Sequence, residues 1–325
     1  MKFSVDPWDV EYGASLGIDG FDPSSADVVV ELEREEADWA PIDATSRAAV
    51  PRRIVFIDGV RRIDARVWIE TPDGDFQPGL CSSYAAGALL CDERAELLVA
   101  EVERGMFSAA PSATDISTEL AAYPARMAAG SDIDALMLAV HERMTQTEVG
   151  IAEAVGRDLS VELIVIDGPL RGRQHIPGTI GLVKSHAVAY LPPALHRVVG
   201  SLAPGQRTPV FTIGTSFSRH SWYLRLPNAD GAPWAGVVRC ECSSDLAPAA
   251  AIALADTAGA TLPRFASEPH KDTRAPQNLY PIGGLERELR RRLGDQAVLY
   301  RALRTVARRS APDPDRGLAA NHRGA

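Results

Sequence analysis

The stretch from Val161 to Ile166 constrains the fold more than any other part of the chain. It is nearly all apolar, which is typical of a strand that lies in the middle of a sheet and is covered on both faces. The run ends in Asp167-Gly168. A second short apolar run, Ile54 to Ile57, ends in the same way, in Asp58-Gly59. The sequence therefore predicts two strands that each end at an aspartate.

The rest of the chain alternates between strand and helix patterns. Apolar residues alternate with polar ones from Arg62 to Glu70, which predicts the hairpin partner of the first strand, with Asp58-Gly59 as the turn. Asp132 is a candidate N-cap for the helix that follows. We predict further strands over 79–91, 96–106, 179–183, 210–214, 222–226 and 236–242, and helices over 132–155, 193–202, 246–258 and 284–293. This order indicates a mixed α/β sheet in one domain.

Both ends of the chain differ in character from the middle. Residues 1–50 are acidic and rich in turn formers, which predicts an N-terminal extension. Residues 308–325 are basic and contain proline, which predicts a disordered tail. The predicted domain therefore covers residues 51–307.

The charge, the cysteines and the apolar runs of the sequence bear on what the chain can bind and where it resides. The formal net charge is -9, whereas a protein that binds nucleic acid usually carries a surplus of Lys and Arg. Four cysteines without C-x-x-C spacing predict buried, reduced thiols and no zinc site. Since the first residues do not resemble a signal peptide and no apolar run is long enough to span a membrane, we expect a cytoplasmic protein.

Asp58 and Asp167 are the first candidates for chemistry. If their strands are neighbours, the two carboxylates converge, and converging carboxylates bind hard divalent cations. The alternative is that Asp-Gly merely closes a hairpin, which is the commonest role of this dipeptide. The segment after Asp167, Pro169-Leu170-Arg171, does not lead into a matching strand, so the alternative fits Asp167 less well than Asp58.

A third carboxylate is suggested by helical spacing. Glu148 lies four residues after Met144 and three before Ile151, on the apolar stripe of its helix, so it is expected to face the sheet. The alternative is a rim position from which the carboxylate reaches water. Glu101 and Glu103 are weaker candidates for the same role.

Cationic groups follow at the end of the strand over 179–183. Lys184 is placed to offset the charge of a phosphate, and His186 to contact phosphate or transfer a proton. The alternative for His186 is a hydrogen-bonded surface histidine. No glycine-rich loop of the G-x-x-x-x-G-K-[ST] type is present, so we do not expect the chain to hydrolyse ATP itself.

Taken together, these motifs resemble the NurA nuclease family over roughly Arg52 to Leu293. The resemblance rests on the order and spacing of short segments. They are Ile54 to Arg61, Arg143 with Glu148, Leu163 to Leu170, Gly181 to His186, Trp222 to Leu226, Val237 to Glu241, and Tyr280-Pro281.

The resemblance implies an RNase H-like mixed β-sheet flanked by helices, with extra C-terminal strands and helices. It further implies a homodimeric, Mn²⁺- or Mg²⁺-dependent DNA nuclease that processes DNA ends for repair beside a HerA-type hexameric ATPase. Asp58, Glu148 and Asp167 are the implied metal ligands. Lys184 and Tyr280 are the implied catalytic groups around the phosphate, and Arg61, Arg171 and His186 are candidate DNA contacts.

The chain also departs from the family pattern. Val60 and Pro169 replace the serines that follow the two Asp-Gly pairs. The histidine expected after the Tyr-Pro tyrosine is missing, and Glu286-Arg287-Glu288 stands there instead, with Glu288 as a possible ligand. These departures and the net acidity favour one alternative, a catalytically impaired module that binds DNA or the ATPase. A second alternative is an RNase H-like enzyme that acts on RNA.

Overall fold

The computed structural model describes residues 22–158, 160–186, 188–229 and 234–310. The chain separates into two compact units, where the sequence predicted one domain over 51–307. Unit 1 comprises the described residues up to Asp58, together with Gly87–Ala100 and Glu148–Arg287. Unit 2 comprises Gly59–Ala86, Glu101–Thr147 and the described residues from Glu288 onward.

Unit 1 contains most of the elements. Its strands are β1 (Asp22–Pro23), β2 (Asp27–Val29), β3 (Ile42–Asp43), β10 (Leu163–Asp167), β11 (Thr179–Val183), β12 (Val188–Ala189), β13 (Gln206–Arg207), β14 (Phe211–Gly214), β15 (Ser218–Arg225) and β16 (Val237–Ser243). Its helices are α2 (Pro193–Ser201) and α3 (Pro248–Thr261), with the short 3-10 helices η2 (Glu36–Asp38) and η3 (Leu262–Phe265). Five longer elements run through both units: β4 (Ile54–Glu70), β5 (Phe76–Cys91), β6 (Ala95–Ser108), α1 (Ile133–Gly156) and α4 (Tyr280–Arg292).

The sheet is mixed, as the order of elements predicted. In unit 1 the strands follow the order β2-β14-β15-β16-β11-β10-β4. The strands β4, β10 and β11 are parallel neighbours, and β11 is antiparallel to β16. The apolar run that ends at Asp167 is thus an interior strand, because β10 has hydrogen-bonded neighbours on both sides. The strand predicted over 179–183 is confirmed as β11.

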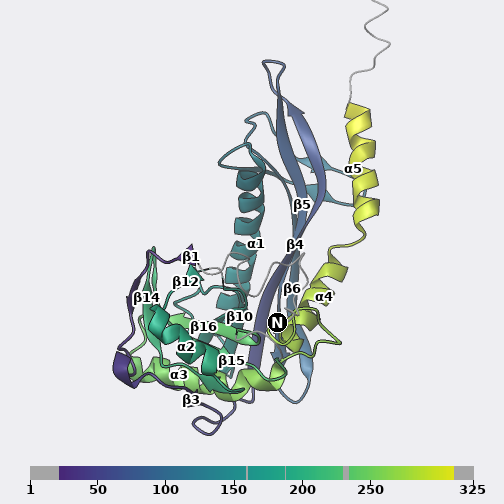
Figure 1. Cartoon of the computed structure of the whole chain (residues 1–325). Coiled ribbons are helices and arrows are strands. Elements are labelled where there is room, and N and C mark those ends of the chain that lie inside the picture. Colours follow the sequence, from purple (N-terminus) through teal and green to yellow (C-terminus); the bar gives the residue numbers. More distant parts are fainter. Residues whose placement is uncertain (1–21, 159, 187, 230–233, 311–325) are drawn as a thin grey trace, which may run out of the picture. The chain divides into compact units, whose positions relative to one another are not determined.

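An alanine-rich helix covers one face of this sheet. The side chains of Phe56, Val165 and Leu182 pack in a core that also includes Ala251 and Ala255 of α3. Such small side chains allow a helix to approach a sheet closely, since interiors are packed without large voids. Figure 1 shows α3, in green, beside β15 and β16. All four cysteines are buried and free, as predicted.

The turn predicted at Asp58-Gly59 is wrong. The strand β4 continues through this dipeptide to Glu70, and the chain reverses only after it, where the N–H of Thr71 donates to the carbonyl oxygen of Asp75 at 2.8 Å. Gly74, with φ +82°, supplies the left-handed residue of that turn. The alternation from Arg62 to Glu70 is therefore the second half of one strand. Asp58 consequently lies within a strand, held on both sides by extended backbone.

The N-terminal segment is part of unit 1 from β1 onward. Its strand β2 pairs with β14 at the edge of the sheet, and β1 pairs with β12. Glu33 forms an ion pair with the buried Arg207, at 2.7 Å. Part of the predicted extension over 1–50 thus contributes to the packed unit. Residues 1–21 of it, and residues 311–325 of the predicted tail, lie outside the described residues.

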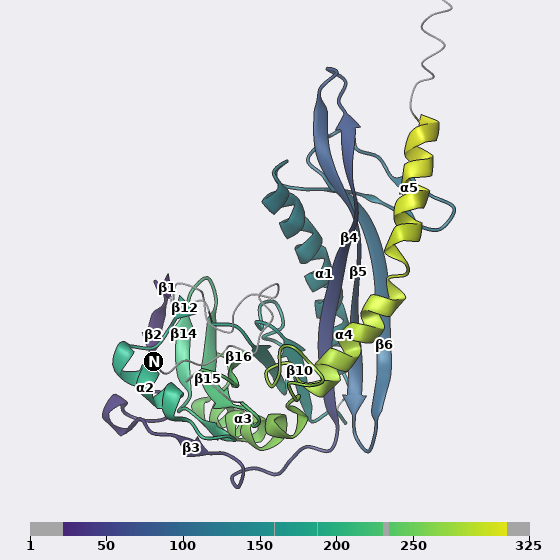
Figure 2. The same cartoon turned by 45° about the vertical axis from the view of Figure 1, so that its right-hand side comes forward.

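Unit 2 is built around the long strands. Here β4, β5, β6 and β9 (Ala125–Met127) are successive neighbours, and β7 (Ile116–Ser117) pairs with β8 (Ala122–Tyr123). In this unit α1 packs Val140 and Met144 against Tyr84 and Phe107, and Figure 2 shows the helix alongside these strands. Asp132 accepts a hydrogen bond from the N–H of Ala135 at 2.9 Å, so the predicted helix and its cap are confirmed.

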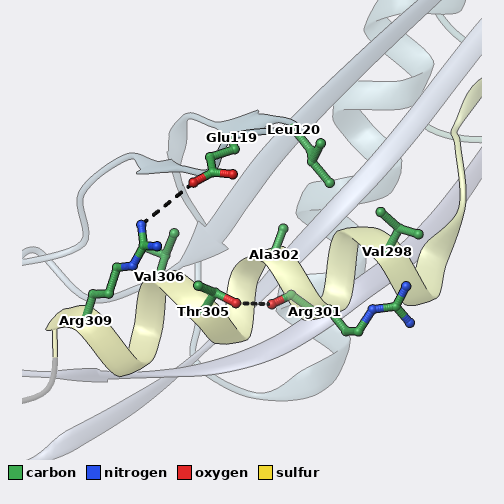
Figure 3. A pocket seen from close by; sticks show the side chains of 8 residues that line it. All are labelled: Glu119, Leu120, Val298, Arg301, Ala302, Thr305, Val306 and Arg309. Carbon is green, nitrogen blue, oxygen red and sulfur yellow. Dashed lines mark hydrogen bonds and ion pairs between the residues drawn. The ribbon is translucent and has the colours of Figure 1, made fainter.

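The last helix, α5 (Gln296–Ser310), includes the first residues of the predicted tail. It buries Leu303 in a cluster with Met106 and Tyr123. A pocket of about 320 Å³ lies beside the helix, lined by residues that include Leu120 and Val298. Figure 3 shows the ion pair between Arg309 and Glu119, at 3.9 Å, at one end of this pocket. In the described part of the chain, no helix combines the length and apolar character needed to cross a membrane.

Candidate metal centre

Three carboxylates converge in unit 1. Asp58 and Asp167 follow directly on the paired residues Ile57 and Ile166 of the parallel strands β4 and β10. The third, Glu286, comes from α4. One oxygen of each carboxylate lies within 4.8 Å of the others. The aspartates meet because the two strands are neighbours that run in the same direction in matched register. Neighbouring strands were the condition on which the predicted convergence depended.

Asp58 is the most deeply buried of the three, with 5% of its surface exposed. Burial raises the pKa of this carboxyl group well above its ordinary value, and the charges of Asp167, Glu286 and Glu148 raise it further, while Lys184 opposes them. The charged form of Asp58 is therefore costly in this cluster. A divalent cation would relieve that cost. Three hard oxygen donors at this spacing fit Mg²⁺ or Mn²⁺.

Lys184 lies at the end of β11 and holds Asp167. Its Nζ donates to Asp167 Oδ2 and to Asn278 Oδ1, each at 2.7 Å. Asn278 in turn donates through Nδ2 to Asp272 Oδ2 at 2.7 Å. Lys184 thus lies beside the carboxylates, and its role toward a phosphate stays a prediction. Its neighbours fix the ammonium group in one position.

Glu286 was not among the residues selected from the sequence. Arg274 donates a hydrogen bond to its carboxylate, and Asn278 Nδ2 lies 3.5 Å from the same oxygen. A signal was available, because Glu286 follows the buried Ile282 by four residues and precedes the buried Leu289 by three. That is the inward spacing that selected Glu148. Glu288, the ligand considered from the sequence, instead bonds Arg291 and Arg292 of its own helix, which lower its pKa to about 2.

Glu148 is buried, as its helical spacing predicted, but it has a different partner. Arg173, itself 3% exposed, forms an ion pair with it and also donates to the carbonyl oxygen of Pro169 at 3.1 Å. Among the described residues, the carboxylates placed to share an ion are Asp58, Asp167 and Glu286. The geometry thus favours Glu286 over Glu148 as the third ligand, and a ligand role for Glu148 stays a prediction. Glu148 still acts on the site, because its charge raises the pKa of Asp58.

His186 does not lie on the surface. It is 4% exposed, its Nε2 donates to the carbonyl oxygen of Val237 at 3.0 Å, and its ring contacts those of Tyr223 and Trp234. Burial lowers its pKa to about 4, so the ring is neutral near neutral pH. A buried, neutral imidazole has no surface to offer a phosphate. The prediction of a DNA contact at His186 is therefore wrong, as is the alternative of a surface histidine.

The remaining candidates form hydrogen bonds with residues other than the three carboxylates. Tyr280 donates to Glu268 Oε2 at 2.9 Å and accepts from Lys271 Nζ at 3.2 Å. Arg61 belongs to unit 2, where its Nη1 lies 3.0 Å from His141 Nδ1. Glu103 of the same unit pairs with Arg143 at 3.0 Å, which gives this weaker ligand candidate a structural partner. Arg171 is exposed and close to Ser216.

The comparisons with known proteins identify no relative of this chain. Neither the family models nor the curated proteins contain a match to this chain. The resemblance to the NurA family therefore rests on the short motifs of the sequence. The convergence of Asp58, Asp167 and Glu286 is the structural observation that bears on function.

Proposed function

We propose that the protein is a Mn²⁺- or Mg²⁺-dependent deoxyribonuclease with Asp58, Asp167 and Glu286 as its metal ligands. The observation that carries the proposal is the convergence of these three carboxylates within 4.8 Å, from two parallel strands and one helix. Burial raises the pKa of Asp58 well above its ordinary value, and the charges of Asp167, Glu286 and Glu148 raise it further. A bound divalent cation would offset both effects.

The donor set agrees with the chemistry of such a site. When bound, divalent cations would activate a water molecule and offset the charge on the leaving oxygen of a phosphodiester. The residues of the chain position the ligands. Lys184 and Asn278 hold Asp167 through a continuous set of hydrogen bonds, and Arg274 orients Glu286. Such supporting contacts keep metal ligands in place and tune their affinity.

The resemblance to NurA extends the proposal beyond the site. It supports an RNase H-like arrangement of the mixed sheet, DNA as the substrate, and action on DNA ends during repair. It also supports a homodimer that works beside a HerA-type ATPase. The sequence has no phosphate-binding loop of its own, so a separate ATPase would supply the energy for movement along DNA.

Cleavage of labelled single- and double-stranded DNA with Mn²⁺ tests the proposal. We expect wild type to cut only with metal. Asp58→Asn, Asp167→Asn and Glu286→Gln should each lose at least about 100-fold in rate, more than the 10- to 100-fold loss typical of a group that only supports a ligand. Glu288→Gln, on the same helix as Glu286, is the matched control and should cut like wild type. Metal-independent cleavage, or equal cleavage by all variants, would contradict the proposal.

One observation favours a second candidate function, a binding module without catalysis. Lys184 Nζ lies 2.7 Å from Asp167 Oδ2, so the ammonium group of this lysine neutralises part of the acidic cluster. In that case the pure protein would bind DNA or the ATPase and would not cut with any divalent metal. Glu148→Gln then helps to separate the two functions. Loss of this supporting carboxylate should reduce the cleavage rate of a nuclease and leave DNA binding unchanged.

A further inference from the structure

Arginine and aromatic side chains alternate in one row in unit 1. The order is Arg171, Phe217, Arg219, Tyr190 and Arg239, which we term the arginine–aromatic ladder. The guanidinium carbon of Arg171 lies 5.9 Å from the centre of the Phe217 ring, and that of Arg219 lies 4.7 Å from the same ring. Arg219 and Arg239 lie 5.5 and 5.1 Å from the centre of the Tyr190 ring. Each ring therefore contacts two guanidinium groups at cation–π distance.

Two members of the ladder stand on segments that leave the candidate metal centre. Arg171 follows Asp167 by four residues, in the loop after β10. Tyr190 follows Lys184 by six residues and comes directly after β12. The loop that carries Arg171 is also fixed to the ladder, because the N–H of Leu170 donates to Glu241 Oε1 at 2.6 Å. The chain thus connects the carboxylates directly to this row of side chains.

The ladder carries more positive than negative charge. Arg219 and Arg239 share one oxygen of the fully buried Glu241, at 3.1 and 2.6 Å. The other oxygen of Glu241 is used by the backbone of Leu170. One carboxylate thus faces two buried guanidinium groups, and Arg171 adds a third at the exposed end. This local excess of positive charge contrasts with the net charge of -9 of the whole chain.

The ladder is buried at one end and exposed to solvent at the other. Arg219 and Arg239 are buried, at 4% and 5% exposure, whereas Arg171 is exposed and Phe217 is partly exposed. Arg171 is the loosest member. Its distance of 5.9 Å from the Phe217 ring is at the limit of a cation–π contact, and its hydrogen bond to Ser216 Oγ is long, at 3.4 Å.

We propose that the Phe217–Arg171 end of the ladder binds an unpaired nucleobase of the DNA strand that enters the carboxylate site. The inference rests on the proposed function. Phe217, supported from within by Arg219, offers a ring for stacking, and Arg171 covers the base or contacts the adjacent phosphate. Aromatic rings beside arginines are the chemistry that single-stranded nucleic acid requires. An unpaired base is the expected ligand, because a base inside a duplex would have to give up both its pairing and its stacking before an aromatic side chain could reach its face.

Binding in the presence of a chelator tests this inference separately from cleavage. Fluorescence anisotropy would be measured on the full chain in EDTA, with a labelled single strand and a blunt duplex of equal length. We expect Phe217→Leu to weaken single-strand binding about fivefold or more, since stacking contributes about 1–3 kcal/mol per base, and to change duplex binding by less than about twofold. Phe217→Tyr keeps the ring and should bind like wild type. Phe76→Leu, at an exposed phenylalanine of unit 2, is the matched control.

Arg171→Gln probes the charged part of the site. It should lower the slope of log affinity against log salt by about 0.7 for the single strand, the value for one lost phosphate contact. Equal losses on single strand and duplex in Phe217→Leu, or an unchanged affinity with only a lower melting temperature, would overturn the inference and make the ladder a structural element. Loss of single-strand binding in Phe217→Tyr would overturn it as well. Since EDTA prevents metal-dependent cleavage, a failed nuclease assay leaves these outcomes readable.

Discussion

Asp58 is buried, which favours its neutral form, whereas metal binding requires its charged form. Its backbone belongs to the interior strand β4, yet its carboxylate lies beside those of Asp167 and Glu286. Because the folded state holds the proton of Asp58 more tightly than the unfolded chain does, this group stabilises the fold only at low pH. Its contribution is complete below the unfolded pKa and is lost as the pH rises through the raised folded pKa.

This leads to a prediction for Asp58→Asn in metal-free protein. Near neutral pH the variant should be more stable than wild type, because asparagine carries no charge that burial makes costly. The gain should vanish below about pH 4, where Asp58 is protonated in both states. Urea unfolding in EDTA across this pH range measures it.

Two further conditions sharpen the result. Added Mn²⁺ should stabilise wild type and leave the variant unchanged, because only wild type keeps the complete set of ligands. Glu142→Gln, on the exposed face of α1, controls for the loss of one negative charge from an acidic protein. A variant that is less stable than wild type near neutral pH would contradict the expected cost of the charged, buried Asp58.

At the residue scale, the sequence predicted the groups that depend on strand direction and missed those that depend on tertiary contacts. Asp58 and Asp167 could be found because each follows an apolar run, and neighbouring parallel strands in matched register bring the residues after these runs together. Glu148 was correctly expected to face inward, but its pairing with Arg173 depends on a loop whose path local sequence does not specify. The burial of His186 between two rings has the same origin.

At the scale of elements, the N-terminal segment is tied to the sheet by one buried arginine. Arg207 is fully buried and pairs with Glu33 of this segment and Asp256 of α3, at 2.7 and 2.6 Å. Glu33 also accepts the N–H of Val210 at 2.8 Å. The acidic, turn-rich composition of residues 1–50 concealed this role, because a carboxylate that pairs across the fold looks like any other in the sequence.

Glu33→Gln should therefore destabilise the protein although it lies far from the carboxylate site in sequence. Removing one partner of a buried ion pair typically costs about 3–5 kcal/mol, and we expect a loss near the lower end because Asp256 still faces Arg207. Chemical unfolding measures the loss. Glu36→Gln, an exposed glutamate of the same segment, is the control and should change stability by no more than about 0.5 kcal/mol. Equal effects of the two variants would show that the segment is only loosely attached.

The long strand β4 shows why boundaries between elements were harder to predict than their types. An Asp-Gly dipeptide is the strongest short-range signal for a hairpin. The prediction therefore placed a turn at Asp58-Gly59 and divided one strand into two. The pairing of β4 with β10 and β5 overrides that local preference. No helix was predicted over 296–310, where α5 forms and places Leu303 in a packed cluster.

For the whole molecule, the division into two units separates the proposed chemistry from the rest of the chain. Asp58, Asp167, Glu286 and the arginine–aromatic ladder all belong to unit 1. The sequence predicted one domain because strands and helices alternate without a linker between them. The division arises instead within long elements that run through both units, and such a boundary leaves no composition signal.

Local stability in the full chain should therefore respond to metal in one unit only. Binding of Mn²⁺ stabilises the conformations that hold the ligands together, so openings that separate these ligands become rarer. We expect slower amide hydrogen exchange in β10, in the first residues of β4 and in the first turns of α4. Exchange in β9 and α5 of unit 2 should stay unchanged. The measurement is hydrogen–deuterium exchange followed by mass spectrometry, with and without Mn²⁺.

Asp58→Asn is the control for this measurement and should remove the response to Mn²⁺. Protection of α5 and β9 alone would place the cation elsewhere and contradict the assignment of the three carboxylates. Protection of both units to the same extent would show that they open together as one cooperative body. The pattern expected from the structure is a response that begins at Asp58, Asp167 and Glu286 and ends within unit 1, because every proposed ligand and its supporting Lys184, Asn278 and Arg274 lie there.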